Sequence, residues 1–166
     1  MQKEAEKFVD SSVMEGMFSI RAILRAAEDG VNDRKIEKIL FDKNKKKSKA
    51  HELAFLRAKS ANLGFEIEFV DAEKLEEITI GNSHGGIVAL CTDRTIGKIE
   101  NMNIRENGFY VMLEGIEDPY NFGYCLRSLY AAGVDGILVG ERNWFSAAGV
   151  VSRASAGASE LFEIAA

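Results

Sequence analysis

The sequence has few of the residues that build metal sites or disulfide frameworks, and it has no long apolar run. Its two cysteines, Cys91 and Cys125, stand far apart with no metal-type spacing, so we expect two free thiols, buried or half-buried, and no metal. No hydrophobic stretch approaches the length of a membrane span, and the polar start Met1–Lys7 is unlike a secretory signal. These absences predict a cytoplasmic protein without a membrane segment.

Nucleotide-binding signatures are absent as well. The chain contains no G-x-G-x-x-G and no G-K-[ST], which excludes a plain Rossmann or P-loop site. His51 is distant in sequence from His84. We therefore interpret His84 as a loop histidine that precedes a strand, in preference to a ligand or a catalytic base.

Charge is distributed unevenly along the chain, although its net value is only −5. Residues 1–59 carry 14 lysines and arginines against 10 acidic residues, a balance of +4, whereas residues 60–166 carry 7 against 16, a balance of −9. Nucleic-acid affinity comes largely from local cations that displace counterions, so the first part of the chain is predicted to face a polyanion. Its lysine run at 43–49 has two interpretations, a solvated loop or a phosphate contact.

The first part of the chain alternates helix and strand patterns, which predicts a compact α/β domain. An amphipathic helix of about ten residues is expected after Ser12–Gly16, with one apolar face and Gly30 at its end. That face consists of Ile20, Ile23, Leu24 and Ala27. The later elements are expected at Ile36–Phe41 (strand), Asp42–Lys49 (basic loop), His51–Ala61 (helix), Glu66–Val70 (strand), Asp71–Leu75 (a short helix capped by its first residue) and Gly85–Leu90 (strand). The polar stretch Thr92–Asn107 is expected to be a linker or a linker helix.

The stretch Leu113–Gly140 has the pattern of a strand, a tight polar turn, a helix and a second strand. Phe109–Leu113 and Ile137–Val139 are the expected strands, and Gly133 ends the helix between them. The apolar face of that helix consists of Phe122, Leu126, Leu129 and Tyr130. This is a βαβ unit, which makes the strands parallel and places the turn at their carboxyl ends, where α/β folds carry their chemistry. A helix around 147–153 and a short strand near 161–164 are expected to follow.

The turn of this unit contains residues suited to more than chain connection. Asp118-Pro119 starts a turn or a helix, because proline at the first helical position loses no hydrogen bond. Asn121 has two interpretations, a helix cap or an amide offered to a ligand. Gly123 leaves room for a backbone or a substrate to approach closely. Arg127 is the only cation of this unit, at helical spacing roughly in line with Asn121 and Gly123.

These positions form the pattern D-P-x-N-x-G-x-x-x-R, carried by Asp118, Pro119, Asn121, Gly123 and Arg127. The pattern resembles motif 1 of the SpoU (TrmH-like) RNA ribose 2′-O-methyltransferases, which belong to the knotted SPOUT class. Further segments match this family in order. Glu15-Gly16 resembles the start of its N-terminal substrate-binding domain, His84–Ala89 resembles the end of that domain, and Arg153–Ala158 resembles the segment between motifs 1 and 2.

The resemblance implies an α/β fold in two parts. Residues 1–92 would form a ribosomal-protein-like RNA-binding domain, 93–107 a linker, and 108–166 the first part of a SPOUT methyltransferase domain, without the knot. Motifs 2 and 3, which bring most of the S-adenosylmethionine pocket in the family, are absent from this sequence. We therefore expect the chain to be inactive by itself. The resemblance also implies S-adenosylmethionine as cofactor, structured rRNA or tRNA as substrate, and a homodimer through the catalytic domain, which is doubtful for this chain alone.

The motif assigns roles to two residues. Arg127 is the motif-1 arginine, and we favour for it the holding of the target phosphate and the stabilisation of the alkoxide. A guanidinium with a pKa above ~12 is a poor base. The alternative is a surface arginine paired with Glu117 or Asp118. Asn121 is expected to support the arginine or to contact substrate.

Other roles are implied more loosely. Ser155 and Gly157 align with a loop that flanks the family's cofactor pocket, with a helix end built of small residues as the alternative. The residues expected to contact RNA are Arg21, Arg25, Lys45, Lys46 and Lys47. Trp144-Phe145 is interpreted as packing in preference to base stacking. A rival hypothesis for the whole chain is a non-enzymatic RNA-binding module without a cofactor pocket, which predicts salt-sensitive RNA binding and no affinity for S-adenosylmethionine.

Overall fold

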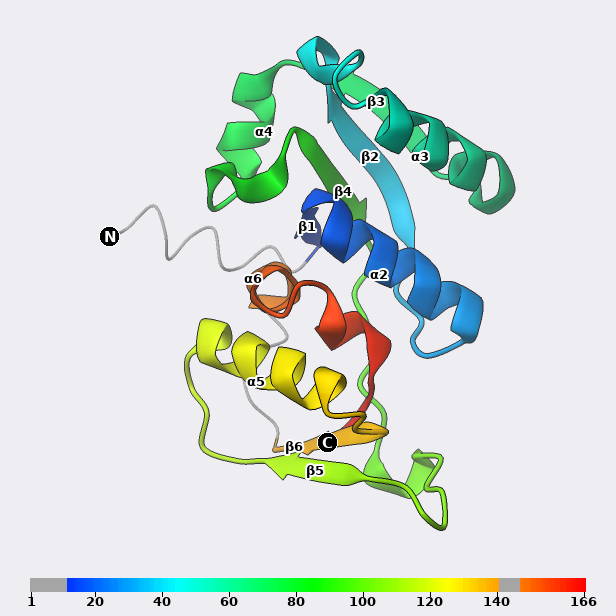
Figure 1. The fold of residues 1–166 in the computed structure, drawn as a ribbon, viewed down its shortest axis with the longest axis vertical. Helices are drawn as coiled ribbons and strands as arrows, with labels where there is room; N and C mark the ends of the chain where they lie inside the picture. The colour runs from blue at the N-terminus through cyan, green and yellow to red at the C-terminus, as the bar shows by residue number, and fades with distance from the viewer. Residues whose placement is uncertain (1–11, 141–146) are drawn as a thin grey trace.

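The computed structural model describes residues 12–140 and 147–166. These residues form a four-stranded sheet and a three-stranded sheet at opposite ends of an elongated molecule (Figure 1). Three helices are stacked between the sheets: α2 (Gly16–Asp29), α6 (Ala148–Ala154) and α5 (Pro119–Ala131). No helix in the described ranges is both long and apolar enough to cross a membrane.

The four-stranded sheet belongs to the first part of the chain. In chain order its elements are β1 (Val13–Glu15), α2, β2 (Ile36–Asp42), α3 (Ala50–Leu63), β3 (Glu66–Val70), α4 (Ala72–Ile78) and β4 (Ile87–Cys91). The strands lie in the order β1-β4-β2-β3. β2 and β3 are parallel and are joined by α3, whereas β4 runs antiparallel to β1 and β2.

Helices cover both faces of this sheet. α2 and α3 pack on one face around a core that includes Ile39 and Phe41. On the other face, Leu75 of α4 packs with Leu40 and Val88. Successive residues of a strand point to opposite faces, so the neighbours Leu40 and Phe41 belong to different cores.

The structure confirms most predicted elements of this part and corrects several details. Glu66–Val70 is a strand as predicted, and the helix at 51–61 extends to Ala50–Leu63. α2 has 14 residues, more than the predicted ten, and Ala26 is buried where Ala27 was expected, Ala27 being exposed. The strand Val13–Glu15 was not predicted. Asp71 precedes α4, but its side chain makes no capping bond and pairs with Lys43 instead.

The three-stranded sheet belongs to the second part of the chain. Its elements are β5 (Tyr110–Leu113), α5, β6 (Gly136–Val139), α6, a 3-10 turn η5 (Ala158–Leu161) and β7 (Glu163–Ala165). The order is β5-β6-β7, and all pairings are parallel, which confirms the predicted βαβ unit. α5 buries Phe122 and Leu126 as predicted, but Tyr130 remains 37% exposed and meets Phe162 edge to face.

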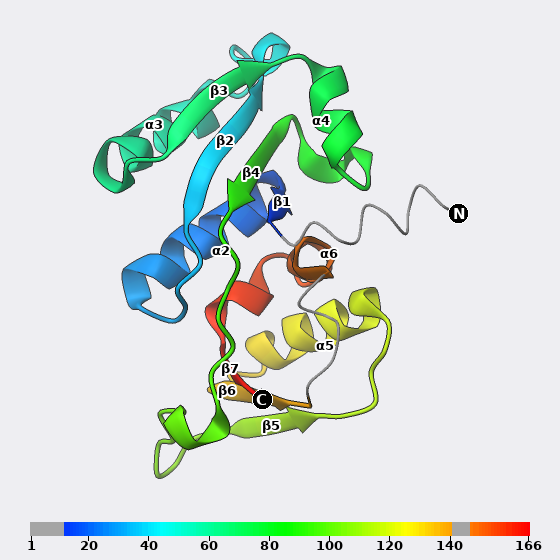
Figure 2. The same cartoon turned by 180° about the vertical axis from the view of Figure 1, so that it is seen from behind.

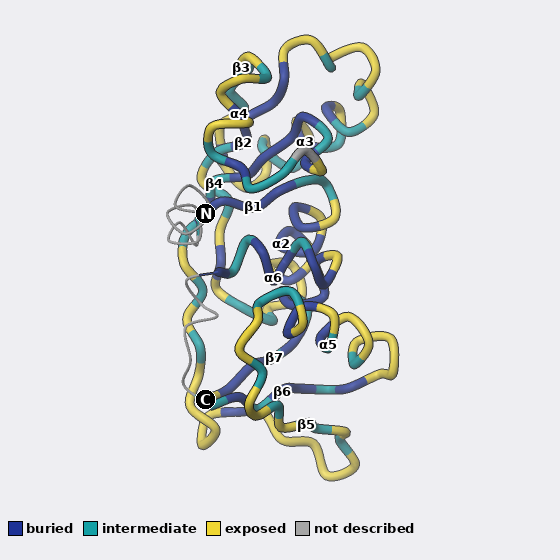
Figure 3. Tube along the Cα trace, turned by 90° about the vertical axis from the view of Figure 1, so that its left-hand side faces the viewer, coloured by how far each residue is buried: buried dark blue, intermediate teal, exposed yellow. Residues whose placement is uncertain are grey.

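The two parts contact each other along α2. One side of α2 faces the four-stranded sheet, and α2 also packs on α6 and η5. Small residues make this second contact close. Ser19, Ala22 and Ala26 are buried at helical spacing, and a Cβ at Gly157 would lie 2.6 Å from the Cβ of Ala22. Figure 3 colours the buried residues of α2 and α6, in the middle of the molecule, dark blue.

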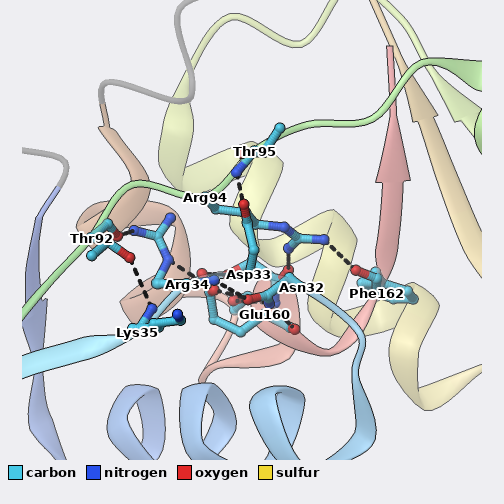
Figure 4. Close-up of polar contacts among 11 residues, drawn as sticks. Asn32, Asp33, Arg34, Lys35, Thr92, Arg94, Thr95, Glu160 and Phe162 are labelled. Atoms are coloured by element: carbon cyan, nitrogen blue, oxygen red, sulfur yellow. Dashed lines mark hydrogen bonds and ion pairs between the residues drawn. The ribbon is translucent and has the colours of Figure 1, made fainter.

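A buried polar cluster joins the parts at a second place (Figure 4). Arg34, which follows α2, pairs with Glu160 of η5 at 3.1 Å, and their side chains are 4% and 3% exposed. Arg34 also donates to the carbonyl of Thr92, and Asn32 donates to the backbone oxygen of Glu160. Arg94 donates to the backbone oxygens of Ser159, in η5, and of Phe162.

The segment 92–107, which leads from one sheet to the other, contacts the three-stranded sheet (Figure 2). It contains a 3-10 turn at Ile99–Asn101. Gly97 forms a parallel bridge with Ala165, and the backbone amide of Ala166 donates to the Gly97 oxygen at 3.0 Å. Residues expected to form a linker thus extend the hydrogen bonding of the three-stranded sheet beyond β7.

Candidate active site and RNA-binding surface

The turn after β5 leads directly into α5. Asp118 is the N-cap of α5, and its carboxylate accepts from the backbone amide of Asn121 at 2.8 Å. Pro119 occupies the first turn, where its missing N–H costs nothing. The interpretation of Asn121 as the cap is therefore wrong. Its side chain is exposed and is left for other contacts.

Arg127 lies two turns further along α5 with its side chain in solvent. The alternative pairing with Asp118 or Glu117 is not seen among the ion pairs of the described residues, and Asp118 is used as the cap. Six residues correspond to about 1.7 turns, so Asn121 and Arg127 leave the helix in directions about 120° apart. The structure therefore does not place them in line. Arg127 shares its face with Tyr120, seven residues earlier.

Gly123 of the same motif is required by packing. A Cβ at this position would lie 2.6 Å from the Cβ of Ala154 and 2.9 Å from the backbone oxygen of Val151. The expectation of a close backbone approach is confirmed, and the approaching element is α6. This contact fixes the distance between α5, which carries Arg127, and the segment that follows α6.

Arg153 at the end of α6 connects the motif to the first part of the chain. Its guanidinium donates to the carboxylate of Glu15 at 2.9 Å and to the hydroxyl of Tyr120 at 2.9 Å. Glu15, at the end of β1, is 7% exposed and also accepts from the amide of Ile80 at 2.8 Å. A Cβ at Gly81 would lie only 3.0 Å from Arg153.

The sequence analysis did not predict the contacts of Arg153 with Glu15 and Tyr120. The resemblance identified Glu15-Gly16 and Arg153–Ala158 as separate family segments, and a buried acidic residue at the end of a strand calls for a cation. That signal does not say which of the distant arginines supplies it.

Of the two residues expected beside the cofactor, Gly157 lies in the contact with α2, and the Ser155 backbone nitrogen lies beside Gly123 of α5. The Ser155 hydroxyl donates to the Ser152 oxygen and accepts from the Ser159 amide, both at 3.1 Å, and the residue is 1% exposed. Gly157 has a φ of +88° and faces Ala22. A cavity of about 160 Å³ lies elsewhere, between the segment 94–102 and β7. Neither Ser155 nor Gly157 lines this cavity.

The basic residues expected to contact RNA are brought to two places. Arg21 and Arg25 lie on the exposed side of α2, with Arg21 over the ring of Phe55. Lys45, Lys46 and Lys47 follow β2, and Lys46 lies 3.7 Å from the centroid of the Phe69 ring. The predicted loop is a 3-10 turn at Lys43–Lys45 followed by turns that lead into α3.

The remaining candidates have structural surroundings. His84 is 8% exposed, and its Nδ1 accepts from the Gly86 amide at 3.1 Å. Burial is the main cause that lowers its pKa. Cys91 is buried and Cys125 half-buried, both as free thiols, and burial raises the pKa of Cys91 to about 12. No cluster of three or more metal-ligating side chains occurs within residues 12–140 and 147–166. Trp144-Phe145 lies outside the described residues.

An α/β part followed by a βαβ unit with the motif-1 pattern is the arrangement expected of the SpoU family, and two family models match the two parts. Residues 13–96 match the model described as RNA 2′-O ribose methyltransferase substrate binding, and residues 108–166 match the SpoU rRNA Methylase family. The chain therefore belongs to the SpoU (TrmH-like) RNA methyltransferase family.

Individual relatives have the same character. The TrmH-family protein YacO of Bacillus subtilis is 29% identical over 139 residues, which cover 81% of this chain and 54% of YacO. The 23S rRNA (guanosine-2′-O-)-methyltransferase RlmB of Bordetella pertussis is 28% identical over 153 residues, which cover 90% of this chain and 59% of RlmB. The chain thus spans little more than half the length of these relatives.

Solved structures share the fold. A crystal structure of an RNA 2′-O ribose methyltransferase matches with a TM-score of 0.70 at 23% identity, covering 99% of this chain and 61% of that protein. The AdoMet-bound rRNA methyltransferase of Sinorhizobium meliloti matches with a TM-score of 0.67 at 24% identity, covering 92% and 52%.

Proposed function

We propose that this chain provides the RNA-binding part and the motif-1 residues of an RNA ribose 2′-O-methyltransferase. The observation that carries the proposal is the position of Arg127. It is an exposed cation on the helix that begins at the motif-1 turn, on the face of Tyr120, which Arg153 ties to the first part of the chain. A phosphate on this face of α5 would accept hydrogen bonds from the Arg127 guanidinium.

The chemistry of the reaction asks for such an arginine. The ribose 2′-hydroxyl is a weak acid, so the enzyme has to position it and stabilise the negative charge that develops on its oxygen. The Arg127 guanidinium suits both tasks, because it stays charged and offers several donors to phosphate and alkoxide. A phosphate oxygen or water takes the proton. Asn121 leaves α5 in another direction and is proposed to contact substrate on the turn side of the helix.

The cofactor we propose is S-adenosylmethionine, which supplies the methyl group. We propose that the described residues do not complete its pocket, because Gly157 packs against α2 and the Ser155 hydroxyl is bonded to Ser152 and Ser159. We therefore propose that these 166 residues do not transfer methyl groups by themselves.

The substrate we propose is structured RNA, rRNA in preference to tRNA because RlmB is an rRNA enzyme. Residues 1–92 would bind it through Arg21, Arg25, Lys45, Lys46 and Lys47, with 93–107 as linker and 108–166 as the catalytic part. We propose a cytoplasmic location, which agrees with the two free thiols. A homodimer through the catalytic part is proposed for the complete enzyme.

A chimera tests the enzymatic proposal. Residues 1–166 would replace the matching part of Bordetella pertussis RlmB, and methyl transfer to 23S rRNA would be measured together with RNA affinity. We expect the Arg127→Ala chimera to lose methyl transfer while RNA affinity falls only modestly, and Arg127→Lys to recover part of the rate. An equal loss of transfer and affinity in Arg127→Ala would contradict the catalytic role.

The second candidate function is a non-enzymatic RNA-binding module. It is favoured by the hydrogen bond of Ser155 to Ser152 and the packing of Gly157 against Ala22, which use both residues in the structure of the chain. Calorimetric titration of the chain with S-adenosylmethionine, and of the chimera beside it, separates the two functions. The methyltransferase predicts binding by the chimera alone. If neither the chain nor the chimera binds S-adenosylmethionine, the RNA-binding module is favoured. If the chain itself binds it, the proposal that its pocket is incomplete is refuted.

A further inference from the structure

Phe18 is 76% exposed, more than any other large apolar side chain of the described residues. It lies in the first turn of α2, whose buried residues face the four-stranded sheet and η5. Spacings of three and seven residues place Arg21 and Arg25 on the same exposed stripe as Phe18. Single exposed apolar residues are common on protein surfaces, so Phe18 gains meaning only from its neighbours.

The neighbouring cations are arranged to meet an anion. The Arg21 guanidinium lies over the ring of Phe55, 4.3 Å from its centroid, and Lys59 approaches the same ring at 5.8 Å. A guanidinium stacked on a ring keeps its N–H groups available at its edge. Arg25 pairs with Asp29 at 3.4 Å, but both side chains are more than half exposed, so water competes for the pair. The stripe therefore combines an aromatic face with two accessible cations.

The start of α2, which carries Phe18, and the motif-1 helix contact the same short segment after α6. A Cβ at Gly157 would lie 2.8 Å from the backbone oxygen of Phe18, and a Cβ at Gly123 would lie 3.1 Å from the backbone nitrogen of Ser155. The two contacts are made by residues only two positions apart, so α2 and α5 flank the same short turn. Figure 1 shows α2 and α5 on the two sides of the α6–η5 segment. Arg127 follows Gly123 by one turn of α5.

We infer that Phe18 is a stacking platform for an unpaired RNA base, with Arg21 and Arg25 on the adjoining phosphates. The inference rests on the proposed function and extends it, because it adds a base contact on α2, across the α6–η5 segment from the helix that carries Arg127. Aromatic side chains bind unpaired bases by stacking, whereas bases inside a duplex are inaccessible to them. The platform thus selects a loop or bulge as the site of modification.

The experiment measures binding of the 166-residue chain to an RNA hairpin with an unpaired loop and to a blunt duplex of the same stem, by fluorescence anisotropy at several salt concentrations. We expect Phe18→Ala to weaken hairpin binding about tenfold and to leave duplex binding unchanged, because one base–aromatic stack is lost. Phe18→Trp should retain the affinity. Phe18→Leu, which keeps apolar area but no aromatic face, should behave like Phe18→Ala.

The matched control is Phe109→Ala, because Phe109 is 50% exposed beside β5, at the other end of the molecule. Circular dichroism confirms that each variant is folded. Equal hairpin affinities for Phe18→Ala and the unaltered chain overturn the platform while the proposed function stands. A change of oligomeric state in Phe18→Ala without a change in affinity overturns it in favour of a contact between copies. Failure of the unaltered chain to bind either RNA in a salt-dependent way refutes the proposed RNA-binding function and the platform together.

Discussion

Two ion pairs hold the two sheets together, and they differ in how far water reaches them. The Arg34–Glu160 pair is buried, at 4% and 3% side-chain exposure, within a cluster of backbone acceptors. The Arg153–Glu15 pair is more open on its cationic side, at 22% and 5%, and Arg153 also contacts Tyr120 of the motif-1 helix. A buried pair penalises the loss of one partner heavily, whereas a partly solvated one leaves its residues adaptable. The first pair is thus suited to a fixed joint, and the second to a site that meets substrate.

The largest effect is expected from breaking the buried pair. Arg34→Ala leaves the Glu160 carboxylate buried without its cation, which should lower the free energy of unfolding by about 3–5 kcal/mol. Urea denaturation of the chain measures this change. The double variant Arg34→Met/Glu160→Leu removes both charges and should recover most of the loss. A double variant as unstable as the single one would show that packing, and not charge burial, governs this joint.

The next largest effect is expected at the close contact between the same parts. In Gly157→Ala the new Cβ would lie 2.6 Å from Ala22, in a backbone conformation with φ of +88°. Overpacking and strain together should cost about 2–4 kcal/mol by urea denaturation. Gly64→Ala is the matched control, since Gly64 has a φ of +81° but nothing within 4 Å of the new Cβ. The control should cost about 1 kcal/mol. Equal costs for Gly157→Ala and Gly64→Ala would show that the contact with α2 relaxes enough to accept the added methyl group.

A smaller effect is expected at the more open pair. Arg153→Ala should lower the free energy of unfolding by about 1–2 kcal/mol. The Glu15 carboxylate keeps its hydrogen bond from the Ile80 amide, and water replaces part of its contact with Arg153. Arg153→Lys should recover part of the Glu15 contact but not the simultaneous bond to Tyr120. A cost as large as that of Arg34→Ala would remove the distinction between the two pairs.

The smallest effect is a dependence of stability on pH near neutrality, expected from His84 on the Glu15 side. His84 adjoins this pair, and burial lowers the pKa of His84 from its ordinary value of 6.5. Below pH 6.5 the unfolded chain therefore takes up a proton before the folded chain does, so stability falls as the pH decreases toward the lowered pKa. Thermal unfolding at a series of pH values should show this slope, reduced in His84→Gln. His51→Gln, at an exposed position of α3, is the control. An unchanged slope in His84→Gln would assign it to other groups.

Local patterns predicted most elements and missed those without a pattern. The strand Glu66–Val70 and the βαβ unit follow from alternation and turn residues that lie close together in the chain. The strand β1 was not predicted, because its three residues are all buried and show no alternation of apolar and polar side chains. Asp118 could have been identified as the cap, because proline at the first helical position places the cap immediately before it. The prediction that Asn121 and Arg127 lie in line was wrong, because a spacing of six residues separates two side chains by about 120° around a helix.

The sequence by itself determined the family, the two α/β units and the residues of motif 1, because turn chemistry, apolar periodicity and motif spacing are local properties of the chain. Tertiary structure alone decided what surrounds that motif. The pairs Arg34–Glu160 and Glu15–Arg153 join residues 126 and 138 positions apart, and many other charged residues could have met instead. Close packing of small residues along α2 and α5 selected these partners, turned Ser155 and Gly157 inward, and left Phe18 and Arg127 in solvent on either side of one turn.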